Sequence, residues 1–120
     1  MQYEVAMFEV SGSFGAMFDR SVRWFEWAIG SRGMFKLGRT SVFGLPALRH
    51  REMYRGAREI RACAIQPRRR ADSALEADAI EVGLTKFALD LYPRRCRNQK
   101  LGGGPSSELV DHAVYVVLWP

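Results

Sequence analysis

The spacing of apolar residues at the start of the chain predicts a strand followed by a helix. In residues 3–10, apolar side chains occupy both alternating sets of positions, as in a strand whose two faces are partly covered. Ser11, Gly12 and Ser13 interrupt that pattern and supply hydroxyls that can cap a helix. The spacing is helical from residue 14 to 29, and Gly30 is a natural stop. The expected apolar stripe of this helix is Phe14, Met17, Phe18, Val22, Phe25 and Ile29.

The middle of the chain carries a weaker period of two. Apolar and polar residues alternate in residues 34–51, which favours a long strand over a helix. Gly38 and Gly44 are expected to form bulges, and Pro46 to lie on an edge or outside the ladder. A basic loop follows, and then a second apolar run at residues 60–65. This order predicts an arginine-rich hairpin between two strands.

The next segment predicts another helix and another strand. Asp72 or Ser73 can cap a helix that runs to Gly83, and residues 87–91 then alternate as in a strand. The resulting order within residues 1–93 is β-α-β-β-α-β. That order predicts an α+β fold, a ferredoxin-like sandwich with two helices on one sheet face and the other face free for a partner.

Residues 94–120 have a different composition and are expected to form a C-terminal extension. A basic hinge is followed by a glycine-rich linker at residues 102–107 and a final run of strand formers at residues 113–119. Such a strand must pair with this domain's own sheet edge or with another chain. The flexible linker favours the second alternative. The residues expected to bind the partner are Val114, Val116, Leu118 and Trp119.

Composition indicates a class of partner only through its charge. The chain has 120 residues, enough for one core, and its 48% apolar content is that of a globular protein. Eighteen Lys and Arg against thirteen Asp and Glu give a net charge of +5. Most of the cations are arginines, whose planar guanidinium suits phosphate. A solvated basic surface is one interpretation of this excess, and a nucleic-acid partner is the other.

Several classes of function find no support in the residues. The two cysteines form neither a disulfide framework nor a metal motif, which suits a reducing compartment. No secretory signal and no run of apolar residues long enough for a bilayer is visible. No phosphate-binding glycine loop or nucleophile motif is present either. The expectation is a protein without a cofactor, a metal site or catalysis. A small nuclease is disfavoured because no metal-binding carboxylates can be identified.

Positive charge is instead concentrated in three segments. They are the middle hairpin, the turn at residues 68–70 and the hinge at residues 94–100. If they converge, His50, Tyr54 and Tyr92 could stack on unpaired bases while arginines hold phosphates. An RRM is excluded because residues 59–63 lack its aromatic RNP1 pattern. The candidate RNA-binding residues are Tyr3, Arg49, His50, Arg51, Arg55, Arg58, Arg94, Arg95 and Arg97.

The chain resembles bacterial-type small-subunit ribosomal proteins of the S-six family, in their divergent mitochondrial form. The matches are Tyr3-Glu4 at the first strand, Arg32-Gly33 after the first helix, Ala47-Leu48-Arg49-His50-Arg51 with Gly44 before it, and Arg55-Gly56 before the third strand. Three features depart from the family pattern: His50 where tyrosine is usual, Pro46 where arginine is frequent, and the tail after Pro93.

The resemblance implies a structural protein of the small ribosomal subunit. It implies binding to small-subunit rRNA through Tyr3, Arg49, His50 and Arg51, and to a neighbouring ribosomal protein of the S-eighteen type. The implied location is mitochondrial, with the cytoplasm as the alternative. The alternative function is a non-ribosomal interaction module, such as a phage or accessory protein, that docks on a larger assembly through residues 113–119.

Overall fold

The computed structural model describes residues 5–98 and 109–120 and shows an α+β fold. The main elements are β1 (Val5–Gly12), α1 (Phe14–Ile29), β2 (Phe35–Ser41), β3 (Glu59–Pro67), α2 (Ser73–Leu91) and β4 (His112–Leu118). Three 3-10 segments lie between them: η1 (Val42–His50), η2 (Glu52–Tyr54) and η3 (Arg70–Asp72). The β-α-β-β-α-β order of a ferredoxin-like sandwich is thereby confirmed.

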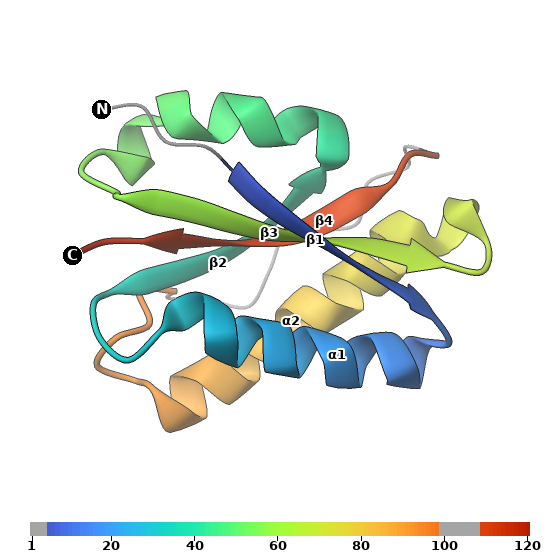
Figure 1. Cartoon of the computed structure of the whole chain (residues 1–120), viewed down its shortest axis with the longest axis horizontal. Helices are drawn as coiled ribbons and strands as arrows, with labels where there is room; N and C mark the ends of the chain where they lie inside the picture. The colour runs from blue at the N-terminus through green and yellow to red at the C-terminus, as the bar shows by residue number, and fades with distance from the viewer. Residues whose placement is uncertain (1–4, 99–108) are drawn as a thin grey trace.

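The four strands form one mixed sheet in the order β1-β3-β4-β2 (Figure 1). β1 and β3 pair in parallel, whereas β4 is antiparallel to both β3 and β2. Phe35 of β2 and Glu59 of β3 therefore both face Leu118 of β4. As a consequence, β1, β2 and β3 all begin at one end of the sheet, and β4 ends there.

The first helix was predicted with its observed limits. Ser13 caps α1 by accepting a hydrogen bond from the Ala16 N–H at 3.3 Å, and Gly30 ends the helix at φ +61°. The buried face includes Met17, Phe25 and Ile29 of the expected stripe. None of the described helices is both long and apolar enough to cross a membrane.

The last strand is an interior strand of this chain's own sheet, between β3 and β2, so its predicted role in binding a partner is wrong. Every residue of β4 is buried. Val114, Val116 and Leu118 pack on the helix side, while Trp119 packs on the opposite side. Apolar residues on both faces are what a strand between two layers requires. The predicted division into residues 1–93 and 94–120 therefore separates one sheet into two parts. The predicted linker at residues 102–107 lies outside the described residues.

α2 continues to Leu91, so the predicted strand at residues 87–91 is wrong. Gly83 does not stop the helix but provides space at the helix–helix contact, because a Cβ there would meet the ring of Phe18. Phe87 lies one helical turn further on, with its ring 6.2 Å from that of Phe25 and 6.4 Å from that of Tyr92. Tertiary packing has overridden the local signal of glycine.

The predicted long second strand and its hairpin are also wrong. β2 stops at Ser41, whose Oγ accepts a hydrogen bond from the Gly44 N–H at 3.2 Å and starts η1. Pro46 lies inside this 3-10 segment. No hairpin joins β2 to β3, since the two strands run parallel with β4 between them. Gly38 is not a bulge but pairs in register with Tyr115.

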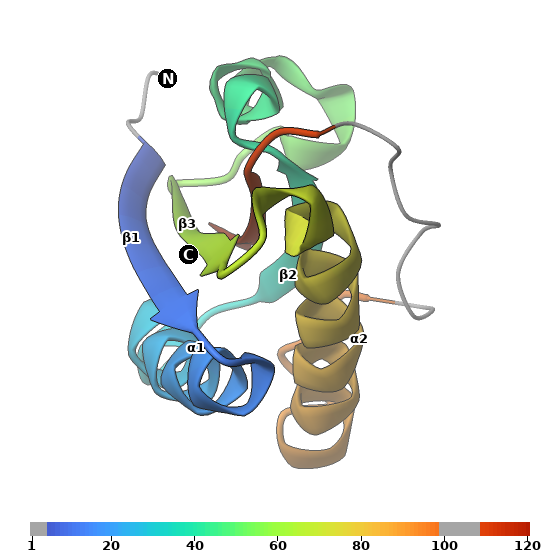
Figure 2. The ribbon, with the colours of Figure 1, turned by 90° about the vertical axis from the view of Figure 1, so that its right-hand side faces the viewer.

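Both faces of the sheet are covered, which corrects the expectation of a free face. Figure 2 shows α1 and α2 on one side and the green segments η1 and η2 on the other. The helix-side core includes Phe25, Phe35 and Leu84. The opposite core is built from η1, η2 and the sheet, and its buried members are Leu45, Leu48, Tyr54, Ala57, Ile60, Ala62, Ala113, Tyr115, Val117 and Trp119.

Candidate nucleic-acid interface

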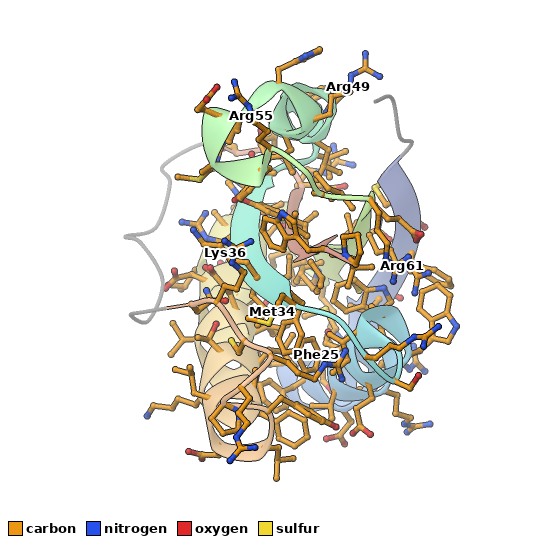
Figure 3. The ribbon with its side chains drawn as sticks, turned by 90° about the vertical axis from the view of Figure 1, so that its left-hand side faces the viewer. Phe25, Met34, Lys36, Arg49, Arg55 and Arg61 are labelled. Atoms are coloured by element: carbon orange, nitrogen blue, oxygen red, sulfur yellow. The ribbon has the colours of Figure 1, made fainter. Side chains whose placement is uncertain are left out.

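The segment between β2 and β3 carries arginines to the end of the sheet where the three parallel strands begin. η1 starts beside the far end of β2 and crosses the sheet face to the near end of β3 (Figure 1). Leu45 and Leu48 bury its inner side. Arg49, His50 and Arg51 follow at its exposed end. In Figure 3, Arg49 and Arg55 lie at the top of this end of the molecule, with Lys36 below them.

Trp119 and Tyr54 join these segments into one surface. The Trp119 indole N–H donates to the Arg55 carbonyl at 3.2 Å, and the ring centres of Trp119 and Tyr54 are 6.3 Å apart. The Arg97 guanidinium lies 4.2 Å from the centre of the Trp119 ring. Arg97 comes from the segment after α2, so the predicted hinge and the middle segment converge here through an aromatic side chain.

Two more cations lie over the other aromatic ring. Lys36 Nζ and the Arg51 guanidinium are each 5.9 Å from the centre of the Tyr54 ring. We call the cations gathered at this end the basic face: Lys36, Arg49, Arg51, Arg55, Arg58 and Arg97. They come from β2, from the η1–η2 region and from the segment after α2, and no local sequence pattern unites them.

Two carboxylates lie within the basic face. Glu52 is 2.8 Å from Arg55 Nη2, and both side chains are almost fully exposed. Glu59 is 3.7 Å from Arg58 and also pairs with Arg61. An exposed pair such as Glu52–Arg55 contributes only about 0–1 kcal/mol. A phosphate can therefore displace Glu52 from Arg55 at small cost.

A hollow of about 240 Å³ opens on this surface. Its lining consists of Arg49, His50, Arg51, Glu52, Tyr54, Arg55, Gly56 and Ala57. Arg49 donates from Nε to Nε2 of His50 at 3.3 Å, which orients the two exposed side chains side by side. Among the residues predicted to stack on bases, His50 is the one that the structure leaves exposed.

Tyr54 is a structural residue and is not available to stack on a base. Its side chain is buried, and its hydroxyl is 2.6 Å from that of Tyr115. Burial, and then the proximity of Tyr54, raise the pKa of Tyr115. Tyr92 is half-buried, with its ring 6.3 Å from that of Phe35. For Tyr54 the predicted stacking role is wrong, whereas for Tyr92 it stays a prediction.

Arg95 is also structural, although it was predicted to bind RNA. Its guanidinium donates to the carbonyls of Ile29, Gly30 and Gly33 at 2.6, 3.2 and 2.8 Å. These are the carbonyls at and just beyond the C-terminal end of α1, where a cation is favoured by the helix dipole. Sequence alone could not separate Arg95 from its neighbours Arg94 and Arg97, which are exposed.

The predicted basic turn at residues 68–70 lies away from the basic face. Tyr3 lies outside the described residues. Arg68–Arg70 follow the far end of β3, opposite the basic face, and Arg70 pairs there with Asp111 at 3.3 Å. The stretch 47–51 that carries the family resemblance belongs to η1 and the residue after it, where a strand was expected. Lys36 was missed, because a lysine near the start of a strand carries no distinguishing signal.

In the described part of the chain, no group of three or more His, Cys, Asp and Glu side chains is placed to hold a metal ion. Burial raises the pKa of the Cys63 thiol to about 12, which keeps it protonated. The expectation that the protein is not an enzyme stays a prediction. No family model, curated protein or solved structure matches the chain.

Proposed function

We propose that this protein binds the phosphate backbone of RNA through the basic face. The observation that carries the proposal is the convergence of Lys36, Arg55 and Arg97 from separate segments around Trp119 and Tyr54. Charges brought together in this way produce a summed potential that attracts a polyanion. A basic surface that is merely solvated would not require its cations to be gathered around aromatic side chains.

The arrangement suits a chain of phosphates better than a single anion. Guanidinium groups bind phosphate oxygens in a bidentate manner, and several of them separated along a surface can follow a backbone. The hollow beside Arg49 and Arg51 offers an additional place for one phosphate or the edge of one nucleotide. The exposed His50 and the planar guanidinium groups can stack on unpaired bases, which favours single-stranded or looped RNA.

The sequence resemblance supports a narrower form of the proposal. In that form the RNA is small-subunit rRNA, the neighbour is a ribosomal protein of the S-eighteen type, and the setting is the mitochondrial ribosome. Its support is the order of the short matches from Arg32-Gly33 to Arg55-Gly56. The terminal strand takes no part in it, since β4 is buried in this chain's own sheet.

A salt titration tests the general proposal. We expect the full chain to bind a fluorescent single-stranded RNA of mixed sequence, and log K to fall linearly with the logarithm of salt concentration. The expected slope is roughly −0.7 for each phosphate neutralised, so four contacts give a slope near −3. Absence of binding at low salt, or binding that salt does not weaken, would contradict the proposal.

Sedimentation with ribosomal subunits tests the narrower form. The protein should move with mitochondrial small subunits, and nuclease treatment should release it. Binding of free RNA without association with subunits would retain the general proposal and overturn the ribosomal one.

A further inference from the structure

The outer edge of β1 is unpaired within the part of the chain that the structure describes. β1 pairs with β3 along one side, and no described residue pairs with its other side. Residues 5–12 pair in unbroken register with residues 60–67, without a bulge. The strand contains no Lys, Arg or Pro, and Met7 and Phe8 are each 46% exposed. Its one charged residue is Glu9. Natural edge strands use lysine, proline and bulges to prevent pairing, so the absence of these three from β1 points to an edge that is covered by another strand.

The opposite edge of the sheet is closed by the chain itself. Asn98 accepts from the Leu37 N–H at 2.9 Å and donates to the Leu37 carbonyl at 3.0 Å. The Arg97 N–H donates to the Phe35 carbonyl, and the Phe35 N–H donates to the Arg95 carbonyl. The segment from 95 to 98 therefore occupies the β2 edge at residues 35–37, so β1 offers the longer continuous edge.

An exposed aromatic group stands beside the open edge on the helix side. The Trp27 ring is 52% exposed, and its centre is 4.9 Å from that of Phe8. The Arg61 guanidinium lies 4.5 Å from the Trp27 ring and donates to the Ala28 carbonyl at 3.0 Å. The indole is thus held between β1 and a fixed cation, which lowers the entropy lost when a partner covers it.

We infer that the protein forms a homodimer in which two β1 strands pair antiparallel across a two-fold axis. This pairing joins the two four-stranded sheets into one sheet of eight strands, with all helices on the same face. A second copy is the occupant because β1 presents the same edge to itself, as an isologous interface requires. The assembly stops at two chains because the pairing uses the β1 edge of both, and residues 95–98 cover the start of the β2 edge.

The residue pattern of β1 selects a register for this pairing. The two-fold axis keeps the helices of both chains on one face of the joined sheet. A β1 residue whose side chain points to the helix side therefore lies opposite a partner residue whose side chain points to that same side. With Phe8 opposite the partner's Phe8, Met7 faces the partner's Glu9 and residues 5–11 are all paired. A shift by one pair toward the C-terminus would place Glu9 opposite the partner's Glu9, which like-charge repulsion disfavours.

The test is the oligomeric state of the full chain without RNA, measured by sedimentation equilibrium. The wild type should show twice the mass of one chain and dissociate on dilution. Phe8→Lys places two like charges opposite each other and removes the aromatic pair, so it should weaken dimerisation roughly tenfold or more. Leu75→Lys is the matched control, since it adds the same charge at an exposed apolar position on α2 and should leave the dimer intact.

Hydrogen exchange keeps the inference falsifiable if Phe8→Lys disturbs the fold. Amides of β1 on the open edge should become protected in wild-type protein as concentration rises, while those of β4 stay protected throughout. A wild-type chain that remains monomeric at high concentration would overturn the inference. So would a dimer whose β1 amides exchange as fast as in the monomer.

Discussion

Gly38 shows how one residue can decide the packing of a sheet face. It pairs with Tyr115 of β4, and a Cβ at this position would meet the Tyr115 ring. That ring cannot move easily, because its buried hydroxyl is hydrogen bonded to Tyr54. From sequence, Gly38 looked like a bulge, since glycine in a strand indicates either a bulge or close approach. Choosing between them requires knowledge of the facing residue.

Gly38→Ala should therefore destabilise the fold by about 1–3 kcal/mol, as overpacking in a core does. The free energy of unfolding in urea measures this loss. Gly15→Ala is the control, because a Cβ there meets nothing within 4 Å and alanine favours the helix by about 0.5–1 kcal/mol. Equal effects of the two substitutions would show that Tyr115 is not confined as described.

Glu81 makes stability depend on pH. It is buried on α2, and desolvation raises its pKa above the ordinary 4.5, with Arg39 lowering it and Asp78 raising it. Arg39 Nε lies 3.9 Å from Glu81 and 3.6 Å from Asp78. The folded chain therefore holds the Glu81 proton to a higher pH than the unfolded chain does. Stability from this group is present at low pH and lost as pH rises through the folded-state pKa.

Glu81→Gln removes that titration. The free energy of unfolding of the wild type minus that of Glu81→Gln should fall as pH rises from below 4.5 toward neutrality. Urea unfolding of both proteins across this range provides the comparison. A difference that stays constant, or that grows with pH, would show that burial does not dominate the Glu81 environment.

At the scale of elements, local sequence signals were sufficient to predict some helices and strands and insufficient for others. α1 has a capping serine, a clear apolar stripe and a terminal glycine, and β3 is a run of apolar residues before Pro67, so both were predictable. α2 was cut short because Gly83 was interpreted without its neighbour Phe18. The partner of β4 could not be predicted, since an apolar strand fits equally well into its own sheet or another chain.

Removal of residues 109–120 tests the place of β4. Without β4, β2 and β3 lose the strand that lies between them, and both cores lose the side chains that β4 supplies. The shortened chain should therefore not unfold cooperatively. Each large apolar side chain lost from a core costs about 2–5 kcal/mol, and several together exceed the stability of an ordinary domain. Circular dichroism during urea titration monitors this, and removal of the exposed Pro120 alone is the control. A cooperative transition in the chain without β4 would contradict the topology.

At the scale of the whole molecule, the arrangement of strands decides which arginines act together. The three basic segments of the sequence separate in space: the middle segment and Arg97 meet at Trp119, Arg95 caps α1, and Arg68–Arg70 lie at the opposite end. Composition predicted that an anionic partner is plausible, but the location of the surface followed only from the parallel course of β2 and β3. The basic face gathers six cations and the opposite end three arginines, and the aromatic scaffold of Tyr54 and Trp119 lies at the basic face.

The most direct test of the account compares RNA binding by two triple variants of equal charge. One carries Arg49→Gln, Arg51→Gln and Arg55→Gln, and the other carries Arg68→Gln, Arg69→Gln and Arg70→Gln; each lowers the net charge from +5 to +2 (5 − 3). If the basic face is the interface, the first variant loses about two of three units of salt slope and at least roughly tenfold in affinity at low salt, whereas the second binds nearly as the wild type does. Equal losses in the two variants would show that net charge alone attracts RNA, and the account would be wrong.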